Sequence, residues 1–214
     1  MKKYLKIYVV GNSTYYASFL QNFKLVFNIE EANVVLFTGG EDVDPVLYGK
    51  KKHYTTHCNI QRDKYEQQIF SRIKPEQVAL GICRGSQFLC VMNGGLLVQN
   101  CNHHAMYGTH EIFNEQTGES YEITSTHHQM QYPYNLDNSD YTVLFKSKEN
   151  RSDYHEGDGI EESILEKRGE PEIVLYHKQG LPKCLAVQGH PEMIPEYPIA
   201  NKINNLLENL VYGE

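Results

Sequence analysis

Short apolar runs alternate with helical patterns along the first half of the chain. Leu5–Val10, Val34–Phe37 and Val78–Ile82 have the length and apolar character of strands, and the last two are typical of strands buried on both faces. Arg62–Ile73 repeats apolar positions at helical spacing, and Gly85–Met92 precedes an Asn-Gly-Gly sequence that favours a helix end. Strands that alternate with helices predict a parallel sheet covered on both faces.

The second half has a different pattern, because short apolar runs follow one another and favour antiparallel strands. Further helices are predicted over Thr14–Phe23 and over Ile199–Leu210, whose apolar residues form a stripe at helical spacing. Glu41–Ile60 is rich in turn residues and predicts a loop, and the nine carboxylates of segment 149–172 predict a solvated surface. The expected strands of this half are His110–Phe113, Tyr121–Ile123, Tyr141–Phe145, Ile173–Tyr176 and Leu185–Val187.

Composition and charge exclude several classes of protein. The 214 residues, of which 40% are hydrophobic, predict one globular domain over residues 1–214. The net charge of −7 argues against nucleic-acid binding, which needs a basic surface. No apolar run approaches the roughly 20 residues of a membrane span, and the five irregularly spaced cysteines argue against a disulfide framework. We therefore expect a cytoplasmic protein that binds neither nucleic acid nor membranes.

The strongest chemical signal is Gly81-Ile-Cys-Arg-Gly85, which lies between a predicted buried strand and a predicted helix. This is the thiol form of a nucleophile elbow, in which glycines flank the nucleophile because larger side chains would collide with the strand or the helix. The helix N-terminus favours a thiolate at Cys83. The alternative is a buried structural cysteine, but the two flanking glycines favour a nucleophile.

A thiol nucleophile needs a base, and Gln188-Gly-His-Pro-Glu192 offers one at the end of a predicted strand. If Glu192 accepts a hydrogen bond from one ring nitrogen of His190, the other nitrogen can face Cys83. Thr38-Gly-Gly40 also ends a strand, and its backbone N–H groups can bind an oxyanion. Taken alone, this glycine pair equally fits an ordinary loop.

The lysine run Lys50-Lys51-Lys52 follows the glycine pair in the sequence. A run of this kind is usually a solvated loop, but here it can also lie at the mouth of the site and attract an anionic leaving group. The histidines and the remaining cysteines show no spacing typical of a metal site, so we expect no metal.

Taken in order, these segments resemble the class I glutamine amidotransferase superfamily, and within it the stand-alone γ-glutamyl hydrolase branch (the γ-glutamyl-GABA hydrolase-like, peptidase C26 group). The motifs that carry the resemblance are Thr38-Gly-Gly-Glu-Asp-Val-Asp-Pro45 with Tyr48-Gly49, Arg62-Asp63 with Glu66, Gly81-Ile-Cys-Arg-Gly-Ser-Gln87, Gly94-Gly95, His127-His128-Gln129, Asp158-Gly-Ile-Glu161 and Val187-Gln-Gly-His-Pro-Glu192.

The resemblance implies a flavodoxin-like α/β fold, with a central, mostly parallel sheet flanked by helices and an antiparallel portion in the second half. It implies a catalytic triad of Cys83, His190 and Glu192. It also implies an oxyanion hole formed by the backbone N–H groups of Gly40 and Arg84, and no metal or organic cofactor.

Substrate contacts are implied for Gln87 and for His127, His128 and Gln129, near the glutamyl group. One residue departs from the superfamily pattern, since the position before the catalytic-type histidine is usually aromatic and here is Gly189. A small residue there either widens the site or leaves His190 less firmly held.

The expected reaction is hydrolysis of the γ-glutamyl amide bond of a small-molecule glutamine derivative through a γ-glutamyl thioester, releasing L-glutamate and an amine or amidate. One specific substrate is γ-glutamyl-CDP-amidate, of bacterial capsule phosphoramidate synthesis. Two alternatives stay open: a glutaminase subunit that passes ammonia to a separate synthetase, and a catalytically silent binding protein of the same fold. A homodimer is also left open.

Overall fold

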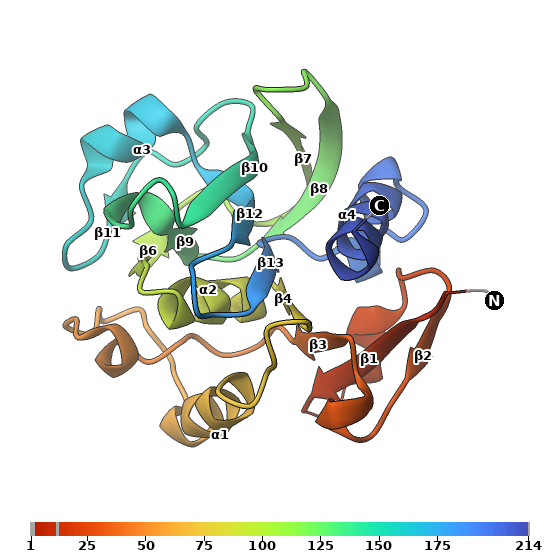
Figure 1. The fold of residues 1–214 in the computed structure, drawn as a ribbon. Coiled ribbons are helices and arrows are strands. Elements are labelled where there is room, and N and C mark those ends of the chain that lie inside the picture. Colours follow the sequence, from red (N-terminus) through yellow and green to blue (C-terminus); the bar gives the residue numbers. More distant parts are fainter. Residues whose placement is uncertain (1–2, 12, 214) are drawn as a thin grey trace.

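A nine-stranded sheet forms the centre of the protein (Figure 1). The structure is a computed structural model that describes residues 3–11 and 13–213. The strands of this sheet are β1 (Leu5–Val10), β2 (Phe23–Leu25), β3 (Val34–Phe37), β4 (Val78–Ile82), β7 (Ala105–Phe113), β8 (Ser120–Thr126), β10 (Tyr141–Ser147), β12 (Pro171–Tyr176) and β13 (Lys183–Val187).

The strand order is β2-β1-β3-β4-β13-β12-β10-β7-β8. Neighbours from β2 to β13 pair in parallel, whereas those from β13 to β8 pair antiparallel. The predicted α/β fold, with a parallel sheet and an antiparallel portion in the second half, is therefore confirmed. The carboxyl ends of β3, β4 and β13 lie side by side, so the loops that follow them meet at one edge.

Helices cover both faces of the sheet and bury two apolar cores. Val35 and Phe37 of β3 belong to the core under the first two helices, whereas Val34 and Leu36 belong to the core under the last helix. None of the described helices is both long and apolar enough to cross a membrane. The helices are α1 (Ile60–Phe70), α2 (Arg84–Met92), α3 (Glu162–Arg168) and α4 (Pro198–Tyr212).

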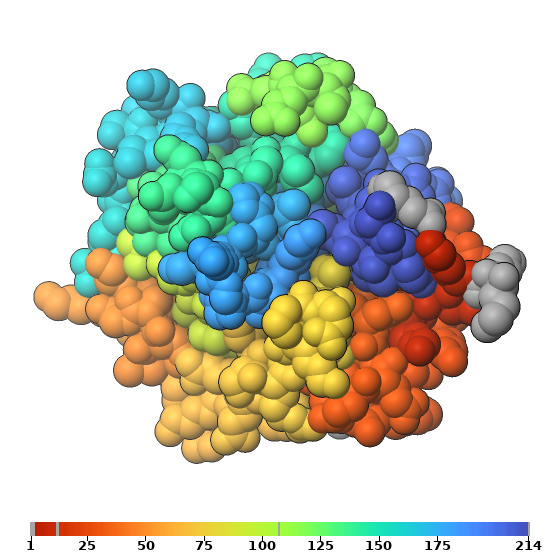
Figure 2. Space-filling model, in the orientation of Figure 1, coloured from red at the N-terminus to blue at the C-terminus, as the bar shows by residue number. Residues whose placement is uncertain are grey.

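Two small sheets and the two ends of the chain complete the arrangement. β5 (Leu96–Val98) pairs with β9 (Met130–Tyr132), and β6 (Asn100–Cys101) pairs with β11 (His155–Glu156). The first and last parts of the chain lie next to each other (red and dark blue in Figure 2). Lys3 Nζ is 4.9 Å from the centre of the Tyr212 ring.

The helix predicted over Thr14–Phe23 is wrong, since only a short 3-10 helix forms, at Thr14–Ala17. The chain then extends, and β2 pairs in parallel with β1 at the edge of the sheet. The backbone N–H of Gln21 donates to Asn204 Oδ1 of α4 at 2.9 Å. Long-range pairing of this kind outweighs a local helical preference.

The acidic segment 149–172 is only in part the solvated surface that its charge predicts. Glu170 and Glu172 are fully buried, and both contact histidines. His155 Nε2 lies 3.0 Å from Glu170 Oε1, and His110 Nε2 lies 2.9 Å from Glu172 Oε1. The prediction is wrong for these two carboxylates, because β12 carries Glu172 into the interior and Glu170 directly precedes this strand.

The contact between α2 and β3 predicts an unusual response to a helix-favouring substitution. Alanine normally stabilises a helix over glycine by about 1 kcal/mol, but a Cβ on Gly85 would collide with the carbonyl oxygen of Phe37. We expect Gly85→Ala to lower the free energy of unfolding by about 2–3 kcal/mol, measured by urea unfolding. Asn205→Ala, on the exposed face of α4, is the control and should not destabilise. A stabilised Gly85→Ala protein would contradict this close approach.

Candidate active site

Cys83 occupies the turn between β4 and α2 in a conformation that non-glycine residues rarely adopt, with φ 52° and ψ −111°. Its N–H donates to Val187 O of β13 at 2.8 Å. Its carbonyl accepts from the Ser86 N–H at 2.9 Å and from the Ser86 hydroxyl at 2.7 Å. These bonds hold a strained residue at the start of α2, where the helix dipole favours a negative charge.

The glycines on either side of Cys83 are required by close packing. A Cβ on Gly81 would lie 2.5 Å from the carbonyl oxygen of Gly85, and a Cβ on Gly85 would collide with the carbonyl oxygen of Phe37. The steric reason predicted for this pair of glycines is therefore confirmed.

His190 and Glu192 follow β13 and lie next to this turn. His190 Nδ1 is 2.6 Å from Glu192 Oε1, and both residues are buried. The backbone N–H of His190 donates to Thr124 Oγ1 of β8 at 2.6 Å. The Cys83 side chain lies close enough to the ring to raise its pKa, so the structure brings the three predicted triad residues together.

The electrostatic surroundings favour a protonated His190 ring. Burial lowers the pKa of His190, but the interactions with Cys83 and Glu192 outweigh it and raise the pKa to about 10. At neutral pH the imidazolium is therefore the favoured form. The imidazolium can therefore donate a proton to the leaving group of a substrate that Cys83 attacks.

The Gly39–Gly40 turn is held from the side of α1. Arg62 Nη2 donates to Thr38 O at 3.0 Å and to Gly39 O at 2.9 Å. Gly40 has φ +136°, and a Cβ there would collide with the Arg62 guanidinium. Glycine is thus needed at Gly40 both for its conformation and for the close approach of Arg62.

A buried group of four charged side chains connects this turn to the nucleophile. The Arg84 guanidinium forms ion pairs with Asp63 and Glu66 of α1. Arg62 Nε lies 2.9 Å from Glu66 Oε1, and Asp63 Oδ2 accepts the Asp44 N–H at 3.0 Å. The side chain of Arg84 is therefore tied to α1, while its backbone N–H stays in the first turn of α2. Sequence reasoning placed these α1 residues in a family motif without a role, because the contacts appear only in the fold.

The residues predicted near a glutamyl group come together around one carbonyl. Gln129 O accepts from Gln87 Nε2 at 2.9 Å and lies 2.9 Å from His127 Nδ1. Burial lowers the pKa of His127 to about 3, so its ring is neutral. His128 is more exposed and lies 3.2 Å from Asp42 Oδ1. The segment from His127 to Gln129 therefore connects α2, through Gln87, with the loop after β3, through Asp42.

The lysine run lies on the loop that follows Gly49. Lys51 and Lys52 are exposed and Lys50 is half-buried. The Lys52 ammonium donates to Cys58 Sγ at 3.4 Å, and a Cβ on Gly159 would lie 2.5 Å from Lys50 Nζ. A role for these lysines in substrate binding stays a prediction.

Packing explains why position 189, which is usually aromatic in the superfamily, is a glycine in this chain. A Cβ there would lie 2.5 Å from Ile123 Cγ1 and 2.7 Å from Thr124 O, both on β8. Ile123 fills the space that a larger side chain would take. The hydrogen bond that the His190 backbone N–H donates to Thr124 Oγ1 holds the histidine backbone in place.

A cleft of about 580 Å³ opens beside the Gly39 turn and is lined in part by Tyr16, Gly39 and Arg62. A Cβ on Gly39 would lie 3.1 Å from His190 Cε1, so the His190 ring borders this cleft. A second cavity, of about 680 Å³, lies between β8 and the start of α4. Its lining includes Tyr121 and Pro198 but no residue of the Gly39–Gly40 turn, so the smaller cleft is the one next to the turn that is predicted to bind an oxyanion.

The fold is that of glutamine amidotransferase-like α/β proteins. A solved structure titled "putative gmp synthase subunit a protein", from Thermoplasma acidophilum, has the same fold, with a TM-score of 0.63 and 16% identity over 100% of this chain and 96% of that chain. The peptidase C26 family model matches residues 22–192. The chain belongs to the peptidase C26 family.

Two curated relatives share part of the sequence. "Putative glutamine amidotransferase Rv2859c" of Mycobacterium tuberculosis is 30% identical over 120 residues, which are 47% of this chain and 39% of that protein. "Protein NtpR" of Enterococcus hirae is 27% identical over 123 residues, 47% of this chain and 52% of that protein. The chain thus spans about half or less of these relatives.

The pairing of His190 with Glu192 predicts a pH-dependent contribution to stability. Interactions with Cys83 and Glu192 hold the folded-state pKa of His190 at about 10, above its ordinary value of 6.5. The stabilisation is therefore fully present below pH 6.5 and is lost as the pH rises through about 10. We expect Glu192→Gln to lower the free energy of unfolding by about 3 kcal/mol at pH 6 and by much less at pH 10.

Chemical denaturation at the two pH values measures this difference. Glu196→Gln is the matched control, since Glu196 is exposed and lies on the same segment. An equal loss for Glu192→Gln at both pH values would mean that Glu192 does not act through the charge of His190.

Proposed function

We propose that the protein hydrolyses the γ-glutamyl amide bond of a glutamine derivative, with Cys83 as nucleophile and His190 as proton donor and base. Glu192 orients the His190 ring and stabilises its positive charge. One observation carries the proposal: the strained turn holds the Cys83 side chain against a His190 ring whose Nδ1 lies 2.6 Å from Glu192. A structural cysteine needs neither the turn nor the charged partner.

The reaction follows from these positions. The Cys83 thiolate forms a bond to the γ-carbonyl carbon, and the carbonyl electron pair moves to oxygen. His190 gives its proton to the amide nitrogen as the C–N bond breaks, which leaves a γ-glutamyl thioester. His190 then takes a proton from water, the oxygen of that water displaces the thiolate, and L-glutamate leaves.

Backbone N–H groups of Gly40 and Arg84 are the proposed oxyanion hole. Arg84 is the first residue of α2, where an N–H has no acceptor within the helix. The charged group around Glu66 links both residues, since it pairs with Arg84 and with the Arg62 side chain that holds the Gly39–Gly40 turn. Loss of one oxyanion donor typically lowers the rate about 100–1,000-fold.

The substrate has two parts in this proposal. Gln87 and the segment from His127 to Gln129 contact the glutamyl group, and Lys50–Lys52 attract an anionic substituent on the γ-nitrogen. A nucleotide-linked amidate such as γ-glutamyl-CDP-amidate has the required charge, and an uncharged amine does not. The alternatives, a glutaminase that serves a separate synthetase and a silent binding protein, are distinguished by the experiment below.

We expect Cys83→Ala to abolish glutamate release, by at least about 10⁴-fold, without loss of the fold. The assay compares glutamine, γ-glutamyl-GABA, a γ-glutamyl peptide and CDP-linked glutamine. Cys58→Ser, at a half-buried cysteine outside the triad, is the control and should keep activity. Preference for a substituted substrate supports the hydrolase. Turnover of glutamine only when a synthetase is added would favour the glutaminase, and substantial activity of Cys83→Ala would refute the nucleophile assignment.

The lysine run gives a separate prediction about the leaving group. Lys51→Glu with Lys52→Glu should raise the KM for CDP-linked glutamine about tenfold, because it reverses local charge, and should change the KM for glutamine little. Lys64→Glu with Lys183→Glu makes the same change in net charge at exposed sites elsewhere and is the control. An equal change in the KM for both substrates would show that these lysines do not bind the leaving group.

A further inference from the structure

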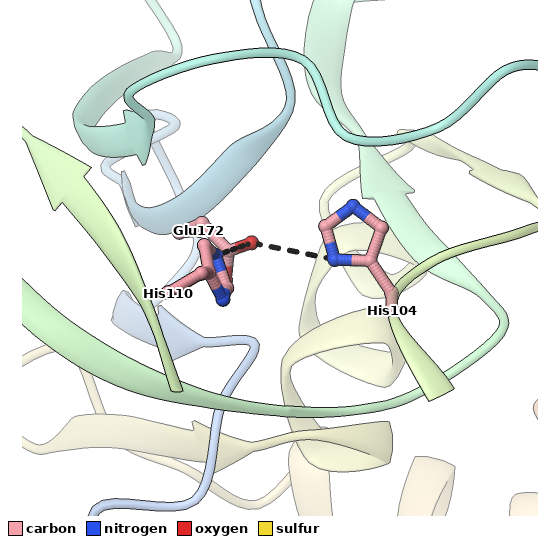
Figure 3. Close-up of side chains that lie close together, drawn as sticks. All are labelled: His104, His110 and Glu172. Atoms are coloured by element: carbon pink, nitrogen blue, oxygen red, sulfur yellow. Dashed lines mark hydrogen bonds and ion pairs between the residues drawn. The ribbon is translucent and has the colours of Figure 1, made fainter. Parts of the chain in front are cut away.

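Two histidines and a glutamate converge in the antiparallel half of the sheet. His104 directly precedes β7, His110 lies within β7 and Glu172 lies on β12, and all three are buried. Figure 3 shows a nitrogen of each ring joined to the Glu172 carboxylate by a dashed line. One ligand-type atom from each residue lies within 4.8 Å of the others. His110 Nε2 is 2.9 Å and His104 Nδ1 is 3.9 Å from Glu172 Oε1.

Oxygen atoms lie close to both ring nitrogens of His104. Nε2 lies 3.1 Å from Glu170 Oε2, but it is buried without an aligned hydrogen bond among the described residues. Ser125 Oγ lies 3.1 Å from His104 Nδ1, but its hydroxyl donates to His104 O at 2.9 Å. Nδ1 therefore faces oxygen lone pairs of Ser125 and Glu172. That arrangement is repulsive unless Nδ1 carries a proton or binds a metal ion.

Two further atoms of the cluster have unused bonding capacity. Glu172 Oε2 and His110 Nδ1 are buried without a hydrogen-bond partner among the described residues. His127 adds a third, since its Nε2 is also buried and unpartnered while its ring centre lies 4.7 Å from that of His104. Buried polar groups of this kind usually have a partner.

We propose that a divalent transition-metal ion of the zinc class binds between His104 Nδ1, His110 Nε2 and the Glu172 carboxylate. Two imidazoles and a carboxylate are a donor set that zinc accepts, and ligands about 2.0–2.1 Å from a tetrahedral ion are roughly 3.3 Å apart. The distances of 2.9 and 3.9 Å to Glu172 Oε1 lie on either side of that value. A fourth position is left for a small oxygen ligand such as water.

The surroundings of His104 match those of a metal-bound histidine. Such a ring commonly presents its second N–H to a carboxylate, which fixes the ring and strengthens its metal-binding nitrogen. Glu170 takes this place beside His104, and it is itself held by the N–H groups of Arg151 at 2.9 Å and Ser152 at 3.0 Å. His155 Nε2, 3.0 Å from Glu170 Oε1, completes that shell.

The ion would have a structural role. It would link β7 to β12, which are separated in the sheet by β10, and it is distinct from the proposed catalytic residues. Glu172 O accepts the Gln188 N–H at 2.8 Å, two residues before His190. A metal bond at Glu172 would thus brace the strand that precedes the histidine of the candidate active site.

The test measures metal binding by the Cys83→Ala protein, which removes the thiol of the candidate active site as a competing zinc ligand. After treatment with a chelator, the protein is titrated with Zn²⁺ and, separately, with Co²⁺. We expect about one bound equivalent by elemental analysis, a Co²⁺ absorption spectrum typical of nitrogen and oxygen ligands, and a Tm that rises with the metal. His110→Gln and Glu172→Gln should each weaken binding at least about tenfold. His177→Gln, outside the cluster, should not.

Two results would overturn the proposal. One is a chelator-treated Cys83→Ala protein that neither binds a stoichiometric ion nor changes its Tm. The other is binding that persists unchanged in both cluster variants. The titration of the Cys83→Ala protein shows whether a stoichiometric ion binds, even if a cluster variant fails to fold. It is also independent of the proposed hydrolase, because it uses no substrate.

Discussion

The buried guanidinium of Arg84 is the constraint on which the candidate active site depends. A charge that is 1% exposed must be paired, and one turn of α1 supplies both Asp63 and Glu66. Glu66 also pairs with Arg62, which holds the carbonyl groups of the Gly39–Gly40 turn. The helix α1, the turn after β3 and the first turn of α2 therefore cannot shift independently. That rigidity keeps the two proposed oxyanion donors at a fixed separation.

Local conformational rules are broken where the chemistry is proposed, and the surrounding structure holds these exceptions in place. Cys83 has positive φ without being glycine, and three hydrogen bonds to its backbone, from or to Val187 and Ser86, stabilise that conformation. His190 is a buried, protonated ring, and Glu192 supplies the charge that burial requires. Strain and buried charge that are compensated from several elements are expected at functional sites.

The sequence predicted the features whose signals lie within a few residues of one another. The buried strands Val34–Phe37 and Val78–Ile82 and the glycines around Cys83 are of this kind, and so the parallel sheet and the turn were predictable. Contacts between distant segments were not. Thr14–Phe23 has a helical pattern, but Asn204 and β1 determine its path. Glu172 lies in an acidic stretch, and its burial depends on His110, 62 positions earlier in the chain.

Two of the buried ionic groups among the described residues differ in how firmly their charge is fixed. Arg62 and Arg84 carry positive charge at any accessible pH, and they match Asp63 and Glu66. Glu170 and Glu172 instead face histidines, whose charge depends on bound protons or on a metal ion. The parallel half of the sheet thus has a permanent electrostatic link, whereas the antiparallel half has a conditional one. Thr124 of β8 accepts a hydrogen bond from His190, and Glu172 of β12 accepts one from Gln188, two residues earlier. Protonation of the histidines around Glu172, or a metal ion bound there, therefore affects how rigidly His190 is held.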